Sequence, residues 1–109
     1  MFRRVFLCAA MLLTNALTPT AKAAEAGLVI NQNQACAFFM LKTPKGLTLV
    51  KANQPPPSNG THMQSDAPMR ERDFATLKTP DGTKYRVWVD LLDRSIASVI
   101  QEYHKQCDA

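Results

Sequence analysis

Four short runs of apolar and β-branched residues fall in two pairs along the chain. They lie at residues 36–41 and 47–52, and again at 74–78 and 84–89. Each pair is joined by a short polar segment that contains both proline and glycine, the pattern typical of a β-hairpin. The sequence therefore predicts two hairpins, with Gly46 and Gly82 at positive φ in their turns.

The two predicted turns resemble each other beyond the turn itself. Six of nine positions are identical after a shift of 36 residues, and the repeated residues are Phe38, Leu41, Lys42, Thr43, Pro44 and Gly46, which recur as Phe74, Leu77, Lys78, Thr79, Pro80 and Gly82. Either one hairpin was duplicated, or two hairpins reached the same turn chemistry independently. Both interpretations favour two hairpins in one sheet or small barrel.

The C-terminal part of the chain changes from strand-like to helical periodicity. Apolar residues recur at spacings of three and four, and they are Leu92, Ile96, Val99, Ile100, Tyr103 and Cys107. Asp90 can cap such a helix, Asp93 suits its positive end, and Lys105 suits its negative end. We expect a helix that opens at Asp90 and packs this stripe on one face of the sheet.

The resulting fold class is α+β, with a small antiparallel sheet or partly open barrel of four to five strands and one C-terminal helix. Residues 24–34 have no clear period and suit a frayed arm or a short edge strand. Residues 53–72 form a proline-rich loop in which 62–64 can pair briefly as an extra strand. Three successive prolines exclude a central strand there, and a loop of this length is usually functional or disordered.

Residues 1–23 have the three parts of a secretory signal: Arg3 and Arg4, an apolar run, and a small-residue cleavage site at 21–23. Thr14 and Asn15 interrupt the apolar run, so we expect no stable membrane insertion after cleavage. The remaining residues, 24–109, suit a single small domain that is periplasmic or secreted. They carry ten basic and nine acidic residues, a balance that argues against a nucleic-acid partner.

The cysteine content predicts a disulfide that stabilises this small domain. Cys8 leaves with the signal, so Cys36 and Cys107 remain and have one possible pairing. An exported protein meets an oxidising compartment, which favours a disulfide over a reactive thiol.

Trp88 is the strongest candidate for a binding residue. Alternation along residues 84–90 places Tyr85, Val87 and Val89 on one face, and Lys84, Arg86 and Trp88 on the other. If the first face meets the helix, the second forms an exposed patch suited to a protein, a glycan or an anionic surface. The alternative is a closed barrel in which another element covers Trp88.

Other chemistry has weaker support in the sequence. His62, Met63 and Met69, with Met40 and His104, include the ligand types of a cuprous site, although methionines more often fill core gaps. The chain has no phosphate loop, nucleophile elbow or metal-ligand motif. We therefore expect no enzyme and no cofactor.

The function that the sequence favours is an exported, disulfide-bonded binding or accessory protein of the bacterial envelope or secretome. It would act by contact with a protein or an envelope surface through Trp88, Arg86, Lys84 and His62, as an inhibitor, an immunity protein or an assembly subunit. The alternative is a periplasmic carrier of a soft metal, copper.

Overall fold

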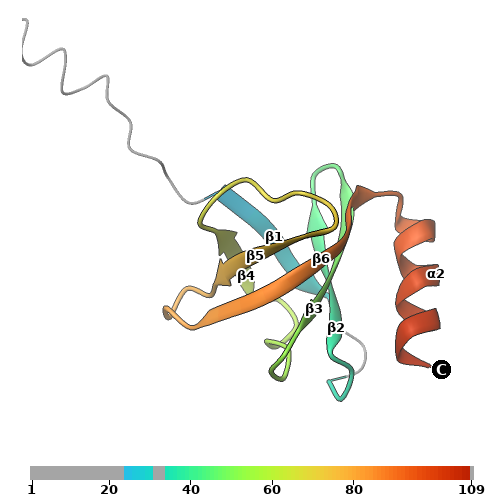
Figure 1. The fold of residues 1–109 in the computed structure, drawn as a ribbon, viewed down its shortest axis with the longest axis horizontal. Coiled ribbons are helices and arrows are strands. Elements are labelled where there is room, and N and C mark those ends of the chain that lie inside the picture. Colours follow the sequence, from blue (N-terminus) through green and yellow to red (C-terminus); the bar gives the residue numbers. More distant parts are fainter. Residues whose placement is uncertain (1–23, 31–33, 109) are drawn as a thin grey trace, which may run out of the picture.

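A computed structural model describes residues 24–30 and 34–108, which form a closed six-stranded β-barrel with one helix on its outside (Figure 1). The predicted secretory signal lies outside the described residues. The elements in chain order are β1 Ala24–Ile30, β2 Phe38–Thr43, β3 Gly46–Ala52, β4 His62–Ser65, β5 Asp73–Lys78, β6 Lys84–Arg94 and α2 Ile96–Cys107.

The barrel closes through β1 and β4, two strands for which the sequence pattern gives only a weak signal. The strand order is β1-β2-β3-β6-β5-β4, and β1 pairs with β4 across the seam, where Leu28 lies opposite His62. The prediction of four to five strands is wrong, because β1 is a full member of the barrel rather than a frayed arm or an edge. The brief strand expected around residues 62–64 is confirmed as β4.

Both predicted hairpins are confirmed. In the first, Thr43 pairs with Gly46 around Pro44 and Lys45. In the second, the amide N–H of Thr79 donates to the carbonyl of Thr83 at 3.0 Å, so the second turn is one residue longer than the first. Gly46 has φ 148° and Gly82 has φ 92°, as the turn chemistry predicted.

The barrel consists of two equivalent three-stranded meanders, β1–β2–β3 and β4–β5–β6. The two meanders join through equivalent strands at both places, since β3 pairs with β6 and β1 pairs with β4. Equivalent positions of β2 and β5 differ by 36 in residue number. The second turn is one residue longer, so equivalent positions of β3 and β6 differ by 37. Lys51 and Trp88 are equivalent in this sense, and they lie directly opposite each other. The sequence match therefore reflects a match of architecture.

One hydrophobic cluster fills the barrel. Its buried members are Ala26, Val29, Phe39, Leu41, Val50, Ala52, Met63, Leu77, Tyr85, Val87 and Val89. These side chains come from all six strands, as expected when inward and outward positions alternate along each strand.

A second cluster lies outside the barrel, beneath α2. Val99 and Tyr103 of the helix pack on Met40, Leu47 and Leu49, the outward side chains of β2 and β3. The helix therefore does not meet Tyr85, Val87 and Val89, which was the condition on which an exposed Trp88 was predicted. Those residues are covered by barrel closure, the alternative that the sequence left open.

The helix also begins later than predicted. β6 continues to Arg94, where it pairs with Leu47, and the side chain of Ser95 caps α2 by accepting the N–H of Ser98 at 3.2 Å. Asp90 is thus a strand residue, and Leu92 packs against the barrel cluster. The predicted helical stripe is correct at Val99 and Tyr103, but Ile96 is 57% exposed and Ile100 is 36% exposed.

The predicted disulfide is present. Cys36 lies just before β2 and Cys107 is the last residue of α2, with 5.6 Å between their Cα atoms. The bridge fastens the far end of the helix to the barrel. Within residues 24–30 and 34–108, no helix has the length and apolar character needed to cross a membrane.

Candidate functional site

Trp88 lies on the outer side of the barrel. Along β6, Tyr85, Val87 and Val89 are buried in the barrel, whereas Lys84 and Arg86 are exposed and Trp88 is half-buried. The alternation expected from the sequence is therefore correct. The sheet closes into a barrel, as in the alternative interpretation of the sequence. Trp88 nevertheless lies on the outside of that barrel and is only half-buried.

The pairing register brings further side chains beside Trp88. Phe38 lies opposite Lys51, Lys51 opposite Trp88, and Trp88 opposite Phe74. These four residues form one row across β2, β3, β6 and β5. The rings of Trp88 and Phe74 meet edge to face with centroids 5.0 Å apart, an arrangement that aromatic pairs favour. Phe74 remains 56% exposed, so an apolar surface is left open to solvent.

Two basic side chains lie over rings of this row. The guanidinium carbon of Arg86 is 5.3 Å from the centroid of Phe74, and Nζ of Lys51 is 5.6 Å from that of Phe38. Such cation–π contacts hold a long side chain in place while its charge stays at the surface. Arg86 also reaches the hydroxyl of Thr76 at 3.5 Å.

Two lysines extend the basic surface towards the β5–β6 turn. Lys78 and Lys84 lie directly opposite each other on β5 and β6. Within the described part of the chain, Lys51, Lys78, Lys84 and Arg86 form no ion pair. We call the surface made by Lys51, Phe74, Thr76, Lys78, Lys84, Arg86 and Trp88 the Trp88 face.

Comparison of the two meanders explains why α2 leaves the Trp88 face open. The helix covers Met40 and Leu49, and the equivalent positions of the second meander are Thr76 and Arg86. Polar side chains at these positions leave no large apolar surface for a second helix to bury. The Trp88–Phe74 pair is the apolar exception on this otherwise polar part of the outer surface.

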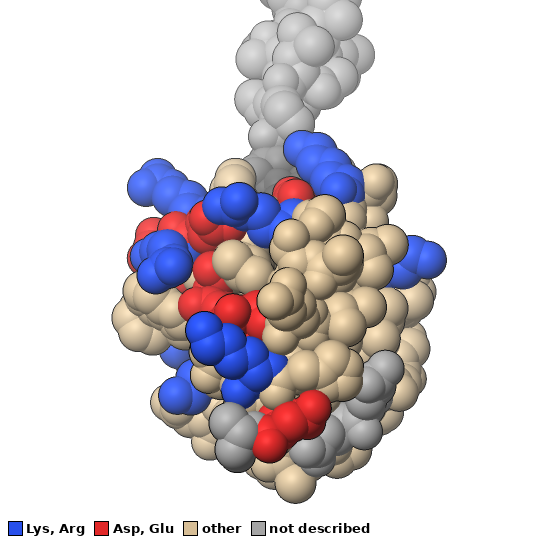
Figure 2. Space-filling view, turned by 90° about the vertical axis from the view of Figure 1, so that its right-hand side faces the viewer, with Lys and Arg blue, Asp and Glu red and all other residues tan. Residues whose placement is uncertain are grey.

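The space-filling view from the side of α2 shows charged side chains mostly on one half of the surface (Figure 2). A separate, apolar groove lies between α2 and the β2–β3 hairpin. It has a volume of about 530 Å³, and its lining includes Ile30, Met40, Leu47, Ile96 and Ile100, with Lys42 and Lys45. Its exposed isoleucines form a second apolar surface with which the Trp88 face can be compared.

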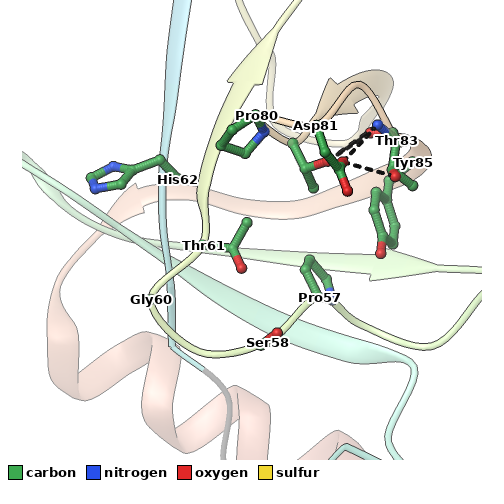
Figure 3. Close-up of a pocket in the computed structure, with 10 residues that line it drawn as sticks. Pro57, Ser58, Gly60, Thr61, His62, Pro80, Asp81, Thr83 and Tyr85 are labelled. Carbon is green, nitrogen blue, oxygen red and sulfur yellow. Dashed lines mark hydrogen bonds between the residues drawn. The ribbon is translucent and has the colours of Figure 1, made fainter.

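His62 does not lie on the Trp88 face. It projects from β4, where its Nδ1 is 3.6 Å from a carboxylate oxygen of Glu25. It lines an open hollow of about 420 Å³ between the proline-rich segment and the β5–β6 turn, whose other lining residues include Thr61, Asp81 and Tyr85 (Figure 3). The structure therefore separates His62 from the three other predicted binding residues.

The carboxylate in this hollow belongs to the turn. Asp81 accepts hydrogen bonds from the hydroxyl of Thr79 and from the N–H and hydroxyl of Thr83. These bonds, led by that of Thr79, lower the pKa of Asp81. They keep the carboxylate ionised and oriented towards its own turn, which is a structural role.

The candidate copper ligands are dispersed. Met63 is buried inside the barrel, whereas Met40 is buried under α2 on the other side of the sheet. His104 lies on the exposed side of α2, with Nδ1 2.9 Å from a carboxylate oxygen of Asp108. Met69 packs against the cluster that contains Met63, but Met40 and His104 lie elsewhere, so the described structure does not bring all five candidate ligands to one site.

The charge-mixed run before β5 provides a structural clamp. Arg94 donates to Glu71 from Nε at 2.8 Å and from Nη2 at 2.6 Å, and the N–H of Leu92 donates to Glu71 at 2.9 Å. The hydrogen bonds from Arg94, followed by that from Leu92, lower the pKa of Glu71 from 4.5 to about 2. The loop before β5 is thereby fastened to the end of β6.

Sequence reasoning missed Phe74, Lys51, Thr76 and Lys78 as members of the Trp88 face. The signal for Phe74 was present, because the β5–β6 turn fixes the hairpin register that places it opposite Trp88. The position of Lys51 depends instead on pairing between two hairpins that are distant in sequence.

No family model, curated protein or solved structure matches this chain. Function is therefore inferred from the site itself.

Proposed function

We propose that this protein is an exported binding or accessory protein of the bacterial envelope or secretome that acts by contact through its Trp88 face. An inhibitor, an immunity protein and an assembly subunit are proteins of this type. The disulfide supports export, because such bonds persist in oxidising compartments.

The observation that carries the proposal is the outward Trp88–Phe74 pair among basic side chains that have no acidic partner in the described chain. Tryptophan and arginine dominate binding energies at protein contacts when they become buried. A half-buried indole beside a phenylalanine that is 56% exposed can bury further area without any rearrangement of the barrel. The Trp88 face thus combines apolar area with fixed charge.

The test is affinity capture from an envelope extract with the exported protein, disulfide intact, as bait. Trp88→Ala should weaken capture of the partner by about 2 kcal/mol, or roughly thirtyfold in affinity, because a central aromatic anchor is lost. The barrel should remain folded, since Trp88 lies outside the buried clusters. Circular dichroism and thermal unfolding check this.

Ile96→Ala is the matched control, because Ile96 is also an exposed large apolar residue but lies on α2. Capture should survive that change. If Ile96→Ala abolished capture while Trp88→Ala preserved it, contact would occur through the groove beside α2 and the proposal would be wrong.

A further inference from the structure

We infer that the Trp88 face recognises an acidic segment of a protein partner, with carboxylates beside an apolar or aromatic anchor. This inference rests on the proposed function and specifies the chemistry of the partner. The free charge of the face, its limited size and the closure of the barrel all favour such a partner.

The basic side chains of the face are available without the loss of an existing ion pair. Arg86 and Lys51 are held over phenylalanine rings, and Lys78 and Lys84 lie opposite each other without an ion pair to any carboxylate in the described structure. Neighbouring like charges raise the free energy of the unbound surface. A partner that brings carboxylates relieves this repulsion, so charge complementarity favours an acidic partner.

The apolar part of the face requires a second kind of group from the partner. Trp88 and Phe74 lie at the end of the same row as Lys51, and Arg86 lies over Phe74. A carboxylate placed at Arg86 therefore brings its neighbouring residues onto the two rings. An apolar centre with a charged rim is the usual anatomy of a protein–protein contact.

Acidic residues limit the extent of the basic surface. Asp90 is the next outward residue after Trp88 on β6, Asp73 precedes Phe74, and Asp81 lies in the turn between Lys78 and Lys84. Asp66 lines a hollow beside Phe74, Thr76 and Arg86. With strands about 4.8 Å apart, a row across four strands spans only about 15 Å.

This boundary favours a short protein segment over an extended anion. A bilayer surface or a nucleic acid would extend past the four cations and meet the surrounding carboxylates, which repel it. A partner cannot add a strand at the β1–β4 seam either, because the two strands are paired there and the barrel is closed. Recognition must therefore occur through outward side chains.

The experiment is a peptide-display selection on the exported protein, with counter-selection on Trp88→Ala. Peptides that depend on Trp88 should be enriched in Asp or Glu next to an aromatic or large aliphatic residue. A synthetic copy of a selected peptide should change the fluorescence of Trp88, the single tryptophan of the chain. Its binding should weaken as salt concentration rises.

Charge substitutions test the same contact. The double variant Lys84→Gln, Arg86→Gln should weaken binding of the selected peptide about tenfold, since both cations lie where its carboxylates would bind. Lys42→Gln, Lys45→Gln is the matched control, because it removes equal charge beside the groove at α2. That control should leave the affinity unchanged.

Several results would overturn the inference. These are enrichment of neutral or basic peptides, no enrichment at all, or tighter binding to heparin or to phosphatidylglycerol vesicles than to the selected peptide. If capture from the extract still required Trp88 in such a case, the inference would fail and the proposed function would stand. If capture also ignored Trp88, both would fail.

Discussion

Gly46 and Gly82 share a positive φ but differ in what surrounds them. A Cβ at Gly46 would lie 2.2 Å from the carbonyl oxygen of Arg94, whereas a Cβ at Gly82 would meet no atom within 4 Å. Gly82→Ala should therefore lower the free energy of unfolding by about 1 kcal/mol, the cost of positive φ for an L residue. Gly46→Ala should cost more than about 2 kcal/mol, because backbone must move as well.

Chemical denaturation of the two variants checks this difference. Gly82→Ala serves as the control for conformational strain without steric overlap. Equal destabilisation of both variants would mean that β3 and the end of β6 are not in the close contact described.

At the same scale, the sequence predicted orientations better than contacts. The two-residue period of a strand was enough to place Trp88 outward and Val87 inward. It could not place Lys51 beside Trp88, because that contact depends on how two separate hairpins pair. The cation–π contacts of Arg86 and Lys51 depend on rotamers, on which the pattern of residue types has no bearing.

At the scale of elements, the end of β6 shows where periodicity misleads. Residues 90–96 fit a helical stripe, yet β6 continues to Arg94 because it pairs with β3 through two register shifts. Asp93 has φ 50°, donates its N–H to the hydroxyl of Thr48 at 3.0 Å, and accepts from the hydroxyl of Thr43 at 2.8 Å. These tertiary bonds outweigh local helical preference, and they delay the helix to the cap at Ser95.

The Glu71–Arg94 clamp at this end of β6 predicts a dependence of stability on pH. The pKa of Glu71 is lowered to about 2 in the folded protein from 4.5. A carboxyl with a lowered folded-state pKa stabilises the fold above its unfolded pKa, and this contribution is lost as pH falls through the folded value. The free energy of unfolding should therefore decrease between about pH 4.5 and pH 2.

Glu71→Gln isolates this contribution in acid and neutral denaturation curves. Because the side chain of Arg94 is 54% exposed, solvent screening limits the expected loss near neutral pH to about 1 kcal/mol. The variant should also lose part of the decrease in stability between pH 4.5 and pH 2. Glu102→Gln, on α2, is the control for removal of a carboxylate elsewhere, and an identical pH profile for both variants would contradict the clamp.

At the scale of the whole molecule, the sequence predicted the parts but left open whether they form an open sheet or a closed barrel. The two hairpins, the C-terminal helix and the disulfide all follow from local patterns. The β1–β4 seam joins a segment without clear period to four residues inside a proline-rich stretch. Neither strand carries a strong signal, so the sixth strand and the choice between an open sheet and a closed barrel could not be predicted.

The disulfide is the covalent bond that holds the C-terminal end of α2 on the barrel. The helix covers Met40, Leu47 and Leu49 with two buried side chains of its own, Val99 and Tyr103. Helices of this length are marginally stable without such packing. The bridge from Cys107 to Cys36 holds the far end of the helix on the barrel.

Cys107→Ser should therefore lower the unfolding midpoint strongly. The bridge spans a sequence separation of 71 residues, and its loss removes about 4 kcal/mol in the chain-entropy treatment of a loop of that length. Hydrogen exchange should rise more in α2 than in β3 and β6, because the helix has fewer buried contacts than the barrel strands. Cys36→Ser should behave in the same way, since either change breaks the same link. Two free thiols in the non-reduced protein, or equal protection of α2 with and without the bridge, would contradict this role for the disulfide.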